Sequence, residues 1–163
     1  MSDHVDHVME QWALQGLDLD ASPMAVVGRI KRLAQIIESE LRVTYNQHAI
    51  DAAAFDVLAT LRRSPPPHQL TPAELMRAAM VTSGAITQRL DRLEGRGLIS
   101  RDRRHGDGRS IRVSLTPEGR ELIEGALKDN FATQERILAG LTPPQRERLG
   151  KDLRRLLQTL GDA

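Results

Sequence analysis

Four Ser-Pro or Thr-Pro pairs divide the chain, and no other feature limits its possible folds as strongly. They are Ser22-Pro23, Thr71-Pro72, Thr116-Pro117 and Thr142-Pro143. A hydroxyl group at the N-cap accepts a backbone N–H, and proline at the first helical position loses a donor that has no partner there. Each pair therefore predicts a helix start. Glu74 and Gln145 follow two of the threonines at capping-box spacing.

Apolar residues between these starts recur every three or four positions, as on one face of a helix. One expected helix carries Val26, Ile30, Leu33, Ile37 and Leu41, and the last carries Leu149, Leu153, Leu156 and Leu160. A short leading helix is expected to contain Val5, Val8 and Trp12. Another runs from Asp51 to Leu61 and is expected to stop at the prolines of residues 65–67.

The middle of the chain has a different pattern. Residues 71–97 predict two helices, 71–79 and 83–96, and then residues 98–100 and 111–115 alternate like strands around a glycine-rich tip. The predicted fold is mostly α with a small β-hairpin wing (α+β), the layout of a winged helix-turn-helix, with helical regions at both ends.

Positive charge is concentrated in the same part of the chain. Residues 65–112 hold nine arginines against five acidic residues, a net charge of +4, whereas residues 1–64 carry −3 and residues 113–163 carry 0. A local basic surface is typical of polyanion binding, although a solvated basic face would give the same count.

Composition excludes several classes of protein. The 163 residues suit one domain, and the absence of cysteine removes disulfides and thiolate chemistry. No apolar run approaches the ~20 residues that cross a bilayer, and the acidic start lacks the basic region of a signal peptide, so we expect a cytoplasmic protein. With four aromatic residues, no phosphate loop and no catalytic set, we expect no enzyme, no cofactor and no metal.

A helical wheel separates an inward-facing side from an outward-facing side in the second predicted helix of this segment, residues 83–96. Ile86, Leu90 and Leu93 share one stripe, which must face inward, and Gln88 lies opposite. Gln88 and Arg92 are therefore the first candidates for base contacts, whereas Arg89 lies at the border of the stripe. The hairpin adds Arg101, Arg103, Arg104 and Arg109 as candidate phosphate contacts. Asp107 either holds Arg109 or the tip in shape or is a solvated turn residue.

Residues 81–101, followed by Asp107-Gly108-Arg109-Ser110 and by Val113-x-Leu115-Thr116-x-x-Gly119, resemble the MarR family of winged helix-turn-helix repressors. Gly108 departs from the family's wing, which usually has arginine there. The resemblance implies a homodimer with dimerisation helices in 1–50 and 117–163, a DNA-binding lobe at 51–116, and DNA contacts that add Thr82, Ser83, Thr87 and Arg89.

The leading helix, residues 17–24 and residues 55–61 further resemble the urate-responsive HucR/PecS branch of the family. This resemblance implies a ligand site at Trp12, Asp56 and Arg89, with Thr87 a weaker fourth member. From the residues alone, Trp12 could simply dock the first helix. Asp56 points away from the apolar stripe of its helix, which by itself suggests a solvated carboxylate, whereas the resemblance favours a buried one.

The leading hypothesis is a homodimeric repressor that binds double-stranded DNA and is released by a small anionic effector such as urate. A metal sensor is the alternative input, using His4, His7, His48, His68 or His105, and His48 could also make the dimer sensitive to pH. A helical adaptor that binds no DNA would explain the flanking helices but would leave the arginine-rich hairpin unused.

Overall fold

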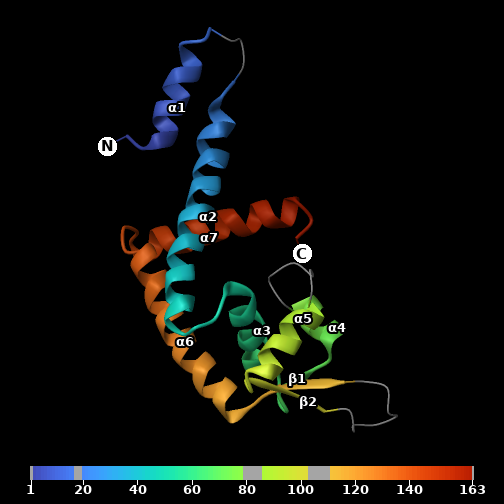
Figure 1. The fold of residues 1–163 in the computed structure, drawn as a ribbon. Helices are drawn as coiled ribbons and strands as arrows, with labels where there is room; N and C mark the ends of the chain where they lie inside the picture. The colour runs from blue at the N-terminus through green and yellow to red at the C-terminus, as the bar shows by residue number, and fades with distance from the viewer. Residues whose placement is uncertain (1, 17–19, 79–85, 103–110, 163) are drawn as a thin grey trace. The chain divides into compact units, whose positions relative to one another are not determined.

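The computed structural model describes residues 2–16, 20–78, 86–102 and 111–162. The chain forms two compact units, residues 1–43 and 44–163, with the boundary inside α2. The helices and strands in chain order (Figure 1) are α1 (His4–Ala13), α2 (Ser22–Gln47), α3 (Ala52–Arg63), β1 (Gln69–Leu70), α4 (Pro72–Ala78), α5 (Ile86–Gly95), β2 (Ile99–Asp102), β3 (Arg112–Leu115), α6 (Pro117–Ile137) and α7 (Pro143–Thr159).

In the first unit, ion pairs and one close contact hold α1 on α2. Asp3 caps α1 by accepting the N–H groups of Val5 and Asp6 at 2.8 and 3.0 Å. Arg29 of α2 pairs with Asp3 at 2.7 Å and with Asp6 at 2.5 Å. Val5 is buried against Gly28, where a Cβ would lie 3.3 Å from the Val5 side chain. The glycine therefore allows the two helices to approach closely.

Helix α2 starts at the predicted Ser22-Pro23 pair, but the residue that caps it differs from the prediction. The helix begins at Ser22 itself, so Ser22 is not the residue that precedes and caps it. Asp20 supplies the acceptor instead, because its carboxylate accepts the backbone N–H of Ser22 at 2.8 Å and the hydroxyl of Ser22 at 2.9 Å. These two hydrogen bonds lower the pKa of Asp20. A charged carboxylate is a stronger hydrogen-bond acceptor than a serine hydroxyl, so Asp20 takes the capping role predicted for Ser22.

The other three predicted starts are also confirmed, since α4, α6 and α7 each begin at the proline of their pair. Thr116 accepts the N–H of Gly119 at 2.9 Å. In the capping box of α7, the backbone N–H of Thr142 donates to Gln145 at 2.8 Å. Ser64 ends α3 beside the proline run, as predicted.

The predicted hairpin is part of a three-stranded antiparallel sheet in the order β1-β3-β2. Ile99 pairs with Leu115 and Arg101 with Val113, while Gln69 of β1 pairs with Ser114 on the other edge. Strand β1 was not predicted, because two residues are too few to show alternation. The hairpin tip, 103–110, and the break between the two middle helices, 79–85, lie outside the described residues.

Helix α3 lies at the centre of the second unit and contacts α4, α5, α6 and β3. The most completely buried side chains come from these elements and from β2: Val57, Leu58, Thr60, Leu61, Leu75, Leu90, Leu93, Ile99, Val113 and Ile123. The fold class predicted from the sequence is confirmed, with a helical majority and a small wing sheet. Among the described helices, none is long and apolar enough to span a bilayer.

At Gly119, near its start, α6 lies directly against the backbone that leads into β2. A Cβ at this position would lie 1.8 Å from the carbonyl oxygen of Leu98, so the backbone just before β2 leaves no room for any other residue. We expect Gly119→Ala to lower the free energy of unfolding by about 3 kcal/mol or more, because this overlap cannot be relieved without moving backbone. Urea unfolding followed by circular dichroism measures the change.

Gly95→Ala is the matched control, since a Cβ at the end of α5 meets nothing within 4 Å. Its effect should stay within about 0.5 kcal/mol. Equal effects of the two substitutions would contradict a steric role for Gly119.

Candidate nucleic-acid interface and effector site

Helix α5 presents a polar ridge to the solvent. Leu90 and Leu93 are buried and Ile86 is half-buried, whereas Thr87, Gln88 and Arg92 are exposed. This division is the one that the helical wheel predicts, with the apolar stripe packed against the rest of the second unit. An exposed helix face that carries glutamine and arginine has the donors and acceptors needed to contact base edges in a major groove.

One flank of α5 is tied to the wing. Arg101 of β2 pairs with Asp91 at 2.6 Å and lies 3.4 Å from Glu94, and its side chain is only 16% exposed. From the sequence, Arg101 is a candidate DNA contact, but in the structure it forms ion pairs that join the strand to the helix. The signal that could have revealed these ion pairs is the spacing of Asp91 and Glu94, which puts two carboxylates on one side of the helix.

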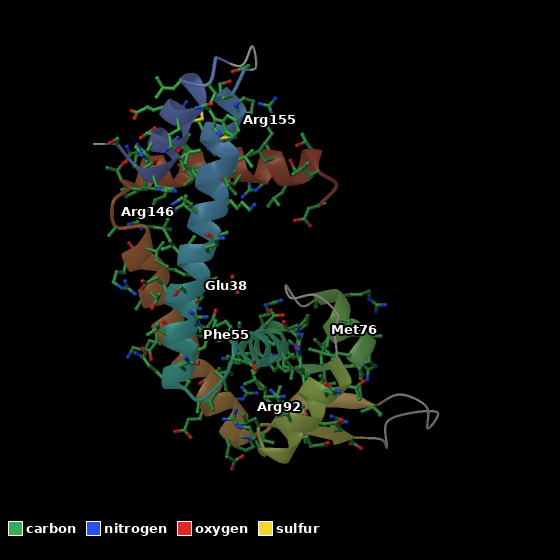
Figure 2. The ribbon with its side chains drawn as sticks, turned by 45° about the horizontal axis from the view of Figure 1, so that its top comes forward. Glu38, Phe55, Met76, Arg92, Arg146 and Arg155 are labelled. Carbon is green, nitrogen blue, oxygen red and sulfur yellow. The ribbon has the colours of Figure 1, made fainter. Side chains whose placement is uncertain are left out.

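The opposite flank of α5 borders a basic pocket of about 230 Å³. Its lining comes from the turn between α2 and α3, the first turn of α3, α5 and the residue after α5: Ala49, Ile50, Asp51, Ala54, Arg89, Arg92, Leu93 and Arg96. Arg96 donates to the carbonyl oxygen of Ala49 at 2.9 Å, and Arg92 lies 3.7 Å from Asp51. Figure 2 labels Arg92 on α5.

The first helix of the pair, α4, is anchored to the base of the wing through Glu74. The Glu74 carboxylate accepts the backbone N–H and the hydroxyl of Thr71 at 2.7 and 2.9 Å, and Arg112 of β3 donates to it at 3.1 Å. The hydrogen bonds from Thr71, and then the positive charge of Arg112, lower the pKa of Glu74. The capping box therefore also positions α4 against the sheet.

Asp56 is buried, with 8% of its surface exposed. The wheel alone suggested a solvated carboxylate, and that interpretation is wrong because α3 is covered on several sides. Burial raises the pKa of the neighbouring Tyr45 phenol; a hydrogen bond from Asn130 opposes this shift and the negative charge of Asp56 adds to it. Tyr45 also stacks on Phe55, a residue labelled in Figure 2, with ring centroids 4.5 Å apart.

Trp12 lies in the first unit, in a pocket of about 550 Å³ between α1 and the start of α2. Its side chain is 45% exposed, and Met9, Pro23 and Met24 are among its neighbours in the lining. The other predicted effector residues, Asp56, Thr87 and Arg89, belong to the second unit.

Five predicted DNA contacts lie outside the described residues: Thr82, Ser83, Arg103, Arg104 and Arg109. Among the histidines that the structure describes, His48 pairs with Asp129 at 2.8 Å and His68 bonds the carbonyl oxygen of Ser64 at 2.6 Å. Within the described part of the chain, no group of three or more His, Asp or Glu side chains could hold a metal ion.

A helix pair with an exposed polar ridge on its second member, followed by a small antiparallel wing, defines a winged helix-turn-helix protein. Residues 50–111 match the model of the MarR family. The chain is 33% identical over 145 residues to the transcriptional regulator PecS of Dickeya dadantii, covering 89% of this chain and 87% of PecS. The chain therefore belongs to the MarR family, whose members are transcriptional regulators and not enzymes.

Two solved structures are also similar. Sco3205, a MarR family regulator from Streptomyces coelicolor in complex with DNA, superposes with a TM-score of 0.77 at 25% identity, covering 88% of this chain and 90% of that one. Rv2887, a MarR family protein from Mycobacterium tuberculosis in complex with p-aminosalicylic acid, superposes with a TM-score of 0.61 at 31% identity, covering 78% and 94%.

The ion pairs of Arg101 with Asp91 and Glu94 predict that Arg101 stabilises the fold. Because Asp91 and Glu94 would lose their partner, we expect Arg101→Met to lower the free energy of unfolding by about 1–3 kcal/mol, measured by urea unfolding. If Arg101 instead contacted a phosphate, the substitution would leave stability unchanged and would reduce the salt dependence of DNA binding by about one counterion.

The anchor at Glu74 predicts a dependence on pH. At pH 7 we expect Glu74→Gln to lower the free energy of unfolding by about 1 kcal/mol. The stabilisation is present above the ordinary pKa of 4.5 and is lost as the pH falls through the lowered pKa of the folded state, so the difference from the native protein should vanish in acid. Urea unfolding at a series of pH values measures it, with Glu121→Gln on α6 as the control. A difference that is constant with pH would contradict the anchor.

Proposed function

We propose that this protein is a homodimeric repressor that binds a pseudo-palindromic DNA site and releases it when a small anionic aromatic effector, such as urate, binds. The observation that carries the proposal is the exposed ridge of α5, with Gln88 and Arg92 outward beside the wing. Glutamine suits adenine and arginine suits guanine or a phosphate, so the ridge can contact both bases and backbone. The DNA complex of Sco3205 supports this use of the fold.

Exposed apolar side chains support a dimer formed through residues 1–50 and 117–163, with residues 51–116 as the DNA-binding lobe. On α2 they include Val26, Val27, Ile30, Leu33 and Ile36, and on α7 they are Leu149, Leu153, Leu156 and Leu157, with Leu160 at its C-cap. Apolar surface on this scale marks a protein interface. A two-fold dimer would place its two α5 helices in major grooves about 34–36 Å apart.

The effector is proposed to act through Arg89 and Asp56. The guanidinium of Arg89 attracts an anionic effector. The negative charge of the bound effector would repel the carboxylate of Asp56, and this repulsion is costly because water screens a buried carboxylate poorly. From the sequence resemblance, Trp12 joins the proposal as an aromatic contact and Thr87 as a polar one. The complex of Rv2887 with p-aminosalicylic acid supports an aromatic acid as the class of effector. The effector must bind the DNA-free form more tightly, since that difference supplies all the energy of release.

Fluorescence anisotropy with a duplex from upstream of the protein's own gene tests the DNA contact. We expect Gln88→Ala to weaken specific binding about tenfold, because a bidentate base contact contributes roughly 1–3 kcal/mol of discrimination. Binding to a random duplex should not change. Lys128→Ala, an exposed residue of α6, is the control and should have no effect.

The same assay tests the effector. Urate should weaken binding of the native protein, and Arg89→Ala and Asp56→Asn should each reduce that response. Specific binding that urate leaves unchanged would reject the effector and keep the regulator. Equal binding of specific and random duplexes would reject the regulator itself.

A further inference from the structure

We propose that Arg63, the last residue of α3, is a positioning residue for DNA binding. It holds the C-terminal end of α4 and thereby sets how α4 supports the exposed ridge of α5. The proposal rests on the proposed function, because it concerns the presentation of that ridge to DNA. Arg63 lies in neither α5 nor the wing strands, and it acts through α4 and not by its own contact with DNA.

The contact that carries the proposal joins the ends of two helices. A terminal N–H of the Arg63 guanidinium donates to the carbonyl oxygen of Ala78 at 2.5 Å, across 15 positions of the chain. Ala78 is the last residue of α4, and the last four carbonyl groups of a helix have no partner within the helix. Arg63 therefore supplies, from α3, a hydrogen bond that α4 cannot make for itself.

The charge of Arg63 also suits this position. Aligned peptide dipoles leave a partial negative charge at the C-terminal end of a helix, and a cation beside the last turn is stabilising. A charged donor also makes a stronger hydrogen bond to a carbonyl than a neutral donor does. The contact therefore combines two favourable effects at the end of α4, and solvent weakens both because Arg63 is exposed.

Polar contacts hold α4 at both of its ends. Near its start, Glu74 accepts a hydrogen bond from Arg112 of β3 at 3.1 Å. At its end, Ala78 accepts the hydrogen bond from Arg63. Leu75 is the buried residue of α4 and sets which face of the helix lies inward, and the two polar contacts add to this packing. One end of α4 is thus joined to the wing and the other to α3.

The position of α4 matters for α5, because the two helices are in contact. In a helix-turn-helix the first helix crosses the DNA backbone and the second enters the major groove, so their relative placement decides whether base contacts form. A loosened end of α4 lowers the fraction of molecules that are competent for specific binding, and the apparent affinity falls by that fraction. Non-specific binding depends on charge and not on base contacts, so it is affected less.

The neighbouring Arg62 provides a matched control within the same turn of α3. Successive residues of a helix point about 100° apart, and Arg62 donates to Glu124 of α6 at 2.8 Å, on another side of α3. Both arginines lie at the end of the same helix, and each makes an exposed polar contact with another helix. They differ in the helix that they hold, so a comparison of the two isolates the effect on α4.

Hydrogen exchange of the full-length protein without DNA, followed by NMR, tests the hold on α4. We expect Arg63→Met to speed amide exchange at residues 75–78 about fivefold, as fits the loss of one exposed charge-assisted hydrogen bond. In this variant, exchange at residues 123–130 of α6 should not change, which separates a local effect from a global loss of stability. Arg62→Met should leave residues 75–78 unchanged. Equal exchange at residues 75–78 in the two variants would overturn the proposal.

Fluorescence anisotropy with specific and random duplexes tests the effect on DNA binding. Arg63→Met should weaken specific binding about fivefold and leave random binding and its salt dependence unchanged, whereas Arg62→Met should change neither. Arg63→Lys should stay within about twofold of the native protein, because the contact uses a single N–H and lysine keeps both a donor and the charge.

Two results would overturn the positioning role. Equal weakening on both duplexes, with a salt slope smaller by about one, would make Arg63 a direct phosphate contact. Unchanged specific binding in Arg63→Met would show that the end of α4 does not control the ridge. If the native protein binds both duplexes equally, the proposed function fails and the role in DNA binding fails with it, while exchange at residues 75–78 still decides whether Arg63 holds α4.

Discussion

The ion pair between Arg101 and Asp91 controls how α5 is presented to its surroundings. Leu90 and Leu93 are the buried residues of this helix and set which of its faces lies inward, and polar contacts on its two flanks add to this packing. The ion pair of Arg101 holds one flank to β2, and the hydrogen bond from Arg96 to Ala49 holds the other flank to the turn before α3. Two polar contacts on opposite sides of an amphipathic helix fix its rotation, and this rotation leaves Gln88 outward.

The arginines of the middle segment show why a charge count cannot replace a structure. Together they predict a single basic footprint, but the described ones have different partners. Arg101 and Arg112 are tied to carboxylates of α5 and α4, and Arg96 is tied to a backbone carbonyl. Arg92 and Arg96 are the exposed members of these four, and Arg92 lies 3.7 Å from the carboxylate of Asp51. The positive surface available to a ligand is therefore smaller than the net charge suggests, and it is concentrated on one flank of α5.

Local signals predicted most of the fold, because helix starts and apolar periodicity depend on neighbouring residues. Thr71, Thr116 and Thr142 precede helices as their spacing indicates. The failures have non-local causes. Strand β1 forms through its pairing with β3. Asp56 is buried because several elements pack around α3 and cover more than its apolar face. The pocket beside α5 combines a turn and a helix about 40 residues apart, and no spacing rule in one helix could reveal it.

Helix α7 shows how the proposed dimer and the stability of the chain depend on each other. None of its residues is buried, although its leucines recur with helical spacing along one face. Isolated helices of this length are marginal in water, and most helical stability comes from packing of the apolar face. A partner that covers these leucines would stabilise the helix and form the interface at once. Folding of α7 would then depend on protein concentration, and loss of one interface leucine would weaken dimer formation and helix stability together.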